Sequence, residues 1–172
     1  DFLSSTARLF KHDSNYRIPV KADPNIVIKY IKASHDLVAQ VVGGCGGVTI
    51  GGMYGVLPNH NDLKSASFQI TMKGFIKDVV TQMKRGLSGF WVAHPDFVRI
   101  GLALVEAWRQ YDAGKEKNLE VLVTGLLEPE HHEEVLNFIR GSDVTGLDPK
   151  SPLYPRSLIV ADISESTFIA NN

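Results

Sequence analysis

The sequence predicts an α/β fold with a parallel sheet, because short apolar strands alternate with longer amphipathic helices. Two strand candidates, residues 46–50 and 89–93, are each followed by a turn and then by apolar residues at helical spacing. Both candidates are apolar without alternation, which is typical of strands buried on both faces. The order strand, turn, helix, strand, turn, helix is the repeat of a parallel βα sheet.

The segments before the first strand favour helices and one extended connection. Residues 2–11 could form a short helix, and residues 17–21 predict an extended segment. Asp23, followed by a proline, is typical of a helix start, because its side chain can cap free N–H groups. Apolar residues then recur at helical spacing as far as Gly43, where a glycine pair would stop the helix. We therefore predict an amphipathic helix over residues 24–42.

The first βα unit begins with the short β-branched strand at residues 46–50. We predict that Gly51, Gly52 and Met53 form a turn after this strand. A polar loop follows, and the next helix ends near Gly86. The apolar residues that trace one face of this helix are Phe68, Met72, Phe75, Ile76, Val79, Val80 and Met83.

The second βα unit begins with residues 89–93, and the turn formed by His94, Pro95 and Asp96 leads into a third helix that ends near Gly114. The apolar residues on one face of this helix are Phe97, Ile100, Leu104, Val105 and Trp108.

The C-terminal third is less regular. Residues 119–123 fit either a strand or a helix end, and residues 130–139 predict a short helix. Residues 141–157 are rich in Gly, Ser, Asp and Pro and predict a long loop, after which residues 157–161 are apolar again.

The composition excludes several classes of function. The chain has 172 residues and a net charge of −1, so no basic field would recruit nucleic acid. No run of about 18 apolar residues predicts a membrane span, and no basic and apolar leader is present. The single cysteine, Cys45, excludes an internal disulfide and a cysteine-based zinc site, and its glycine-rich surroundings predict a small buried residue. The single cysteine fits a reducing cytoplasm, so we expect a cytoplasmic location.

Gly51, Gly52 and Met53 are the first candidate site. They follow a predicted strand at the end that faces the active site in parallel α/β folds. The glycines would let a substrate or an acyl-CoA approach the backbone closely, and a tight turn without a ligand is the alternative. No glycine-rich nucleotide-phosphate motif is present.

Trp91, His94 and Pro95 form a second cluster at a strand end. The histidine could orient an anionic substrate or donate to a carbonyl, or it could only cap or fill a turn. His131 and His132 lie among glutamates, but neighbours in sequence point to different faces of a helix. A solvated charged helix is therefore a better interpretation of that pair than a metal site.

One stretch resembles the malate synthase family. A helix is followed by IGGMYGVLPNHND, then by a helix ending in QMKRG and by GFWVAHPDFV, in the order and spacing of that family. WVAHP is a fairly specific string, whereas GGM alone is weak. The similarity covers about residues 1–110 and thins out afterwards.

The resemblance implies part of a (β/α)8 TIM barrel with parallel strands and flanking helices. Residues 1–114 would be the C-terminal part of the barrel domain, and residues 115–172 an irregular α/β extension leading towards a C-terminal helical domain. A barrel needs about 250 residues. We therefore expect the chain to be an excerpt, with the remainder of the barrel in the same chain or in a partner chain.

The resemblance also implies a chemistry, and a peroxisomal or glyoxysomal location if the organism is a eukaryote. The family condenses acetyl-CoA with glyoxylate in the glyoxylate cycle through an enolate stabilised by Mg²⁺, and the thioester is then hydrolysed. Asp1 would be a magnesium ligand; the metal-binding Glu, the Arg and the Asp base are expected outside this chain, which alone should be inactive. The residues that would line the glyoxylate and acyl-CoA end of the barrel are Gly51, Gly52, Met53, Trp91, His94 and Pro95.

Other functions stay open at this point. Many family members have a glycine where this chain has Asp96, so the acyl-CoA and the aldehyde are not fixed. Related barrels that cleave or form malyl-CoA or citramalyl-CoA esters share the same metal and enolate chemistry. A non-catalytic half-barrel that serves as an interaction or scaffold module is the alternative from another class, and an α/β domain without an assignable function is a third. We expect neither nucleic acid nor a membrane as partner.

Overall fold

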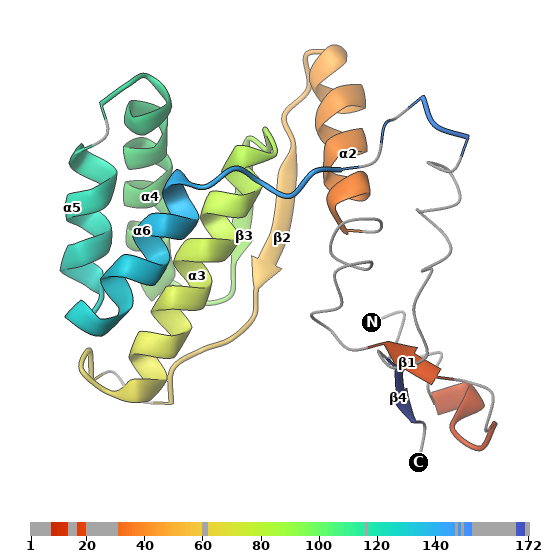
Figure 1. Cartoon of the computed structure of the whole chain (residues 1–172), viewed down its shortest axis with the longest axis horizontal. Helices are drawn as coiled ribbons and strands as arrows, with labels where there is room; N and C mark the ends of the chain where they lie inside the picture. Colours follow the sequence, from red (N-terminus) through yellow and green to blue (C-terminus); the bar gives the residue numbers. More distant parts are fainter. Residues whose placement is uncertain are drawn as a thin grey trace. The chain divides into compact units, whose positions relative to one another are not determined.

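The computed structural model divides the chain into two units, residues 38–143 and residues 1–37 with 144–172 (Figure 1). None of the described helices is long and apolar enough to span a membrane. The structure describes residues 8–13, 31–59, 62–115, 117–146, 148 and 150–152, together with the backbone of residues 17–19 and 168–170.

The unit that contains both chain ends has a small antiparallel sheet. Strand β1 (Arg17–Pro19) pairs with β4 (Phe168–Ala170), so the extended segment predicted at residues 17–21 is confirmed for its first three residues. Helix α2 (Ala33–Gly44) confirms the second half of the helix predicted over residues 24–42, whose first part lies outside the described residues.

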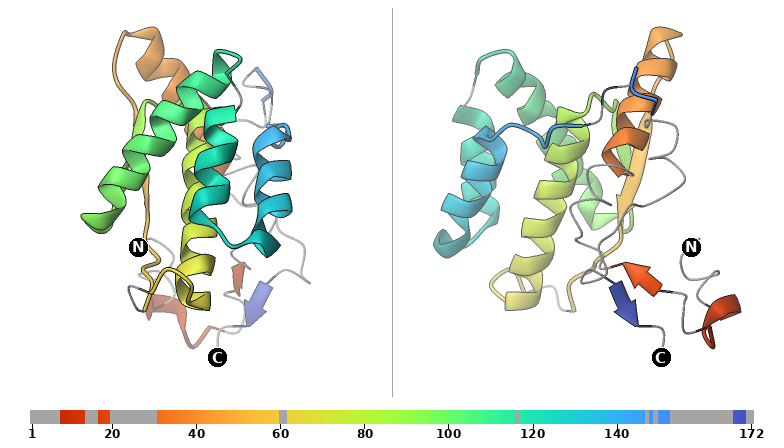
Figure 2. Two further views of the ribbon diagram at one scale, coloured as in Figure 1. Left: turned by 90° about the vertical axis from the view of Figure 1, so that its left-hand side faces the viewer. Right: turned by 45° about the vertical axis from the view of Figure 1, so that its right-hand side comes forward.

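Residues 38–143 contain a two-stranded parallel sheet and four packed helices (Figure 2). Strand β2 (Ile50–Tyr54) leads to α3 (Ala66–Lys84), and β3 (Gly89–Val92) leads to α4 (Asp96–Asp112). The strands are parallel and β2 pairs directly with β3, which confirms the two predicted βα units. The elements that follow are α5 (Lys117–Leu126), the 3-10 helix η2 (Pro129–His131) and α6 (His132–Arg140).

Helix α3 has a serine cap at its start and ends where its sequence predicts. The Ser65 hydroxyl accepts a hydrogen bond from the backbone N–H of Phe68 at 3.2 Å, which caps the first turn. At the other end Gly86 takes a φ of 74°, a left-handed conformation that favours glycine. Residues 119–123, which fitted either a strand or a helix end, belong to the helix α5.

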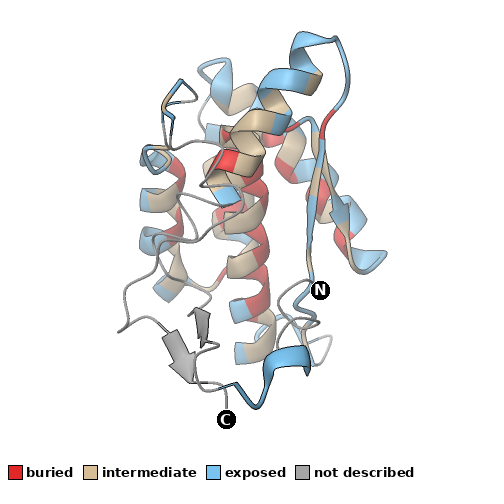
Figure 3. Cartoon of the chain, turned by 90° about the vertical axis from the view of Figure 1, so that its right-hand side faces the viewer, coloured by how far each residue is buried: buried red, intermediate tan, exposed pale blue. Residues whose placement is uncertain are grey.

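The core of this unit lies around α3, which contacts the sheet, α4 and α6, while α5 packs between α4 and α6. Figure 3 shows the buried positions along the inward faces of these helices. The apolar residues predicted on the face of α3 between Met72 and Val80 are all buried. The complete core cluster consists of Met72, Phe75, Ile76, Val79, Val80, Phe97, Leu104, Ala107, Leu119, Val123, Leu127, Val135 and Ile139.

Three expectations were wrong. The first strand was predicted at residues 46–50, but the glycines that follow belong to β2 itself, because pairing with β3 begins at Ile50. The two strands are not buried on both faces in this structure, since Trp91 on β3 is 67% exposed and Ile50 on β2 is 55% exposed. Cys45 is exposed rather than buried, because it lies in the turn after α2.

Two lysines of α3 hold α6 through one carboxylate. The Lys73 ammonium lies 2.9 Å from Glu134 Oε2, and Lys77 donates to Glu134 Oε1. These two hydrogen bonds, the one from Lys77 foremost, lower the pKa of Glu134 from 4.5 to about 2. The carboxylate therefore stabilises the packing of α6 against α3 while it is ionised.

We expect the free energy of unfolding of Glu134→Gln to fall less than that of the wild-type chain as the pH is lowered from 7 to 2. A depressed carboxyl pKa contributes stability fully above pH 4.5, and this contribution is lost as the pH falls through about 2. The side chain is half-exposed, so the loss at pH 7 should be no more than about 1 kcal/mol. Urea unfolding between pH 2 and pH 7 measures it, with the neighbouring Glu133→Gln as control for net charge. Equal profiles for the two variants would contradict the prediction.

Candidate functional site

The carboxyl ends of β2 and β3 lie side by side, as the parallel register requires. Tyr54, the last residue of β2, is paired with Val92, the last residue of β3. The two predicted clusters, one at the end of each strand, are therefore brought to the same edge of the sheet. In parallel α/β folds this edge carries the binding and catalytic residues.

The face of this sheet away from the helices is open and apolar. Among the described residues, Trp91 is 67%, Ile50 55% and Met53 52% exposed. Phe90 and Tyr54 point to the other face, where they pack against the core around α3. Because side chains alternate along a strand, each strand presents one set of residues to the helices and another to the open face.

The His94 ring is oriented by the first turn of α4. Its Nδ1 accepts a hydrogen bond from the backbone N–H of Asp96 at 3.2 Å. The neutral ring then carries its proton on Nε2, which can donate to a carbonyl or a carboxylate. The Asp96 carboxylate lies 3.4 Å from the same Nδ1, so protonation of the ring would create an ion pair. Pro95 occupies the N-cap position of α4 and fixes the turn between the histidine and the helix.

A partly buried polar layer lies behind β2, on the face of α3 that meets the strand. Gln82 donates to Asp78 Oδ2 at 2.8 Å and to the carbonyl of Gly52 at 3.1 Å. Burial raises the pKa of Asp78, against the opposing effects of the hydrogen bond from Gln82 and the charge of Arg85. Burial, with a smaller contribution from the Asp78 carboxylate, raises the pKa of Tyr54.

Sequence reasoning missed this polar layer. Asp78 and Gln82 are four residues apart and therefore share a face of α3, and Gly74 adds a small residue one turn earlier. A polar pair and a glycine on one face of α3 were the sequence signal that could have revealed a second contact surface of this helix.

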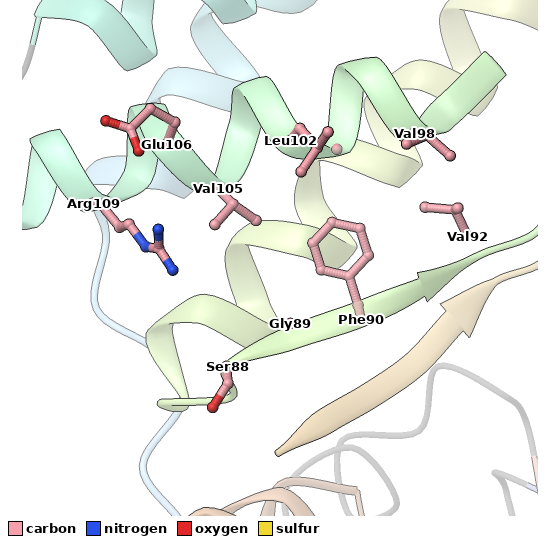
Figure 4. A pocket seen from close by; sticks show the side chains of 10 residues that line it. Ser88, Gly89, Phe90, Val92, Val98, Leu102, Val105, Glu106 and Arg109 are labelled. Atoms are coloured by element: carbon pink, nitrogen blue, oxygen red, sulfur yellow. The ribbon is translucent and has the colours of Figure 1, made fainter. Parts of the chain in front are cut away.

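A groove of about 470 Å³ runs between β3 and α4 on the side away from β2 (Figure 4). Phe90 and Val92 point into it from the strand, and Val98, Leu102 and Val105 from the helix. At one end the groove is polar, where it is lined by Ser88, Glu106 and Arg109.

The described residues contain no group of three or more His, Cys, Asp and Glu side chains that could hold a metal ion. Asp1, the metal ligand implied by the resemblance, lies outside the described residues, so its role stays a prediction.

The family model of the malate synthase TIM barrel domain matches residues 1–129. This match includes both βα units and both strand ends. The chain belongs to the malate synthase family. The two parallel strands with their helices are the part of a TIM barrel that the structure describes, and no solved structure matches the chain significantly.

The structure places most of the candidate residues at or near the shared edge of β2 and β3. Gly52 and Met53 lie at the bend of β2, Trp91 lies on β3, and His94 and Pro95 follow it. Gly51 differs from its neighbours because it faces α3: a Cβ on this residue would lie 1.7 Å from Oε1 of Gln82. Its location favours a close contact between strand and helix rather than contact with a substrate.

Proposed function

We propose that this chain is part of a malate-synthase enzyme that condenses acetyl-CoA, or another acyl-CoA, with glyoxylate. The enolate formed from the acyl-CoA would attack the aldehyde carbon, and hydrolysis of the thioester would then release free CoA. The observation that carries the proposal is the shared edge of β2 and β3. It brings the GGM segment and the WVAHP segment together in a chain of this family.

His94 is the described residue best placed to contact a substrate. Its side chain is half-exposed, and its Nε2–H is available because Nδ1 is engaged by the backbone of Asp96. Both glyoxylate and a thioester present oxygen acceptors to such a donor. We propose that His94 orients one of these oxygens, while Trp91 and Met53 supply apolar surface beside it.

Parts of the protein outside this chain would supply the other metal ligands and the base. Mg²⁺, with Asp1 as one of its proposed ligands, would stabilise the oxyanion of the enolate. We further propose that other βα units of the barrel cover the open sheet face and the groove between β3 and α4. A closed barrel has no unpaired strand edge, so further strands would pair with the outer edges of β2 and β3.

The test is release of CoA by the native protein that carries this chain. With Mg²⁺, acetyl-CoA and glyoxylate, we expect thiol release that needs both substrates and stops with EDTA. Cleavage of malyl-CoA to acetyl-CoA and glyoxylate, or of citramalyl-CoA to acetyl-CoA and pyruvate, without thiol release would favour a lyase instead. Absence of turnover with every one of these substrates would contradict an enzymatic role and favour an interaction module.

We expect His94→Ala to lower kcat/KM in that assay by about 100-fold, since removal of one donor to a developing oxyanion has effects of this order. His131→Ala, which changes a histidine far along the chain on η2, is the matched control and should leave kcat/KM unchanged. A kcat/KM of His94→Ala equal to that of the wild-type protein would contradict the proposed role of His94.

A further inference from the structure

The pairing of β2 with β3 is interrupted within the GGM segment. Gly51 pairs with Phe90 and Tyr54 pairs with Val92, so that two residues of β2 stand opposite the single residue Trp91. These two residues, Gly52 and Met53, are both exposed, whereas strict alternation would turn one of them towards α3. This two-against-one arrangement is a β-bulge, a feature that redirects side chains at strand ends.

A side chain from α3 supplies a hydrogen bond at this bulge. Gln82 is only 2% exposed, and its amide nitrogen donates to the carbonyl of Gly52 at 3.1 Å. The same nitrogen donates to Asp78 Oδ2 at 2.8 Å, which fixes the orientation of the amide. A strand carbonyl inside the interrupted ladder is therefore held by a helix that also forms the core.

The neighbouring glycine makes this contact possible. A Cβ on Gly51 would lie 1.7 Å from Oε1 of Gln82 and 2.9 Å from Cδ1 of Leu87. Within the described part of the chain, Gln82 Oε1 is a buried atom without a hydrogen-bond partner. Burial of an unpaired oxygen costs free energy, so the two hydrogen bonds of the amide nitrogen have to offset it.

We propose that Gln82 is a positioning residue that holds the bulge at Gly52 and thereby directs Met53 at the carboxyl end of β2. Gln82 does not contact the substrate; it acts through the backbone of Gly52. The catalytic consequence rests on the proposed function, in which this strand end lines the acyl-CoA and glyoxylate site. The structural consequence, the direction of Met53, is independent of that function.

The chain offers a matched control on the same helix. Gln69 is also buried, and it also makes two hydrogen bonds, donating to the carbonyl of Leu63 at 2.7 Å and accepting from the backbone N–H of Glu128 at 2.8 Å. Neither partner belongs to the bulge. Gln82→Leu and Gln69→Leu therefore remove equal numbers of hydrogen bonds at different distances from the strand end.

The first measurement is methyl NMR of the 172-residue chain, labelled at the methyl groups of its three methionines. We expect Gln82→Leu to shift the Met53 methyl signal, and Gln69→Leu to leave it in place. Signals of Met72 and Met83 in both variants report whether the core remains folded. An unchanged Met53 signal in a folded Gln82→Leu chain would overturn the proposal.

The second measurement is steady-state kinetics of the native protein that carries this chain. We expect Gln82→Leu to lower kcat by about 10- to 100-fold with a smaller change in KM, since small displacements of reacting groups have effects of this size. Gln69→Leu should leave kcat unchanged despite its loss of stability. An equal loss of kcat in both variants would overturn the positioning role. A wild-type protein without turnover would contradict the proposed function, and the NMR result would still decide the role of Gln82.

Discussion

Phe75→Ala is expected to lower the free energy of unfolding by about 3–5 kcal/mol, the range for deletion of a buried phenylalanine ring. Phe75 is 1% exposed at the centre of an aromatic cluster. Its ring stacks on Phe97 with centroids 4.8 Å apart and meets Phe90 edge-on at 6.0 Å. Phe90 belongs to β3 and Phe97 to α4, so loss of the Phe75 ring removes contacts of α3 with both the sheet and α4.

Urea unfolding followed by far-UV circular dichroism measures this loss. Ile70→Ala is the matched control, because Ile70 lies on the same helix but is 60% exposed, and its change should stay within about 0.5 kcal/mol. Since whole domains are stable by only about 5–15 kcal/mol, the Phe75 variant should approach complete unfolding at 25 °C. Similar urea unfolding midpoints for the two variants would show that Phe75 is not part of the stabilising core.

Gly51→Ala is expected to be nearly as harmful, although it adds a single methyl group. The new Cβ would overlap Oε1 of Gln82, which is itself buried and cannot swing into solvent. Overpacking costs about 1–3 kcal/mol, and displacement of the amide adds the loss of its hydrogen bonds to Gly52 and Asp78. We therefore expect a total loss of about 2–4 kcal/mol from these two contributions.

The adjacent glycine is the control for this variant. A Cβ on Gly52 meets no atom within 4 Å, so Gly52→Ala should leave the free energy of unfolding unchanged or raise it by up to about 1 kcal/mol. If Gly52 lines the substrate site, the same variant should lose kcat/KM while its unfolding midpoint stays the same. Equal destabilisation by Gly51→Ala and Gly52→Ala would show that the Gln82 side chain does not contact Gly51 as described.

The local sequence determined the two βα units. Apolar residues at helical spacing in α3 and the glycine after it predicted this helix and its end, because these signals act within a few residues. The parallel pairing of β2 and β3 followed from the connecting helix, since a crossover of this length joins parallel strands. These local signals were therefore enough to place the strand ends that carry Met53 and His94 at one edge of the sheet.

Only the tertiary structure decided how the GGM segment is used. Sequence reasoning took the two glycines together as a turn, because a glycine pair indicates a turn and cannot reveal what approaches it from elsewhere in the chain. In the structure Gly51 makes room for Gln82, which lies near the end of the following helix, and Gly52 accepts its hydrogen bond. Contacts of this kind depend on the packing of α3 against β2, which neither segment specifies alone. The sequence by itself therefore determined the order of elements, the edge that carries the candidate residues and the resemblance to the family. Packing between distant segments decided that Gly51 makes room for a helix side chain and that Gly52 has open space beside it.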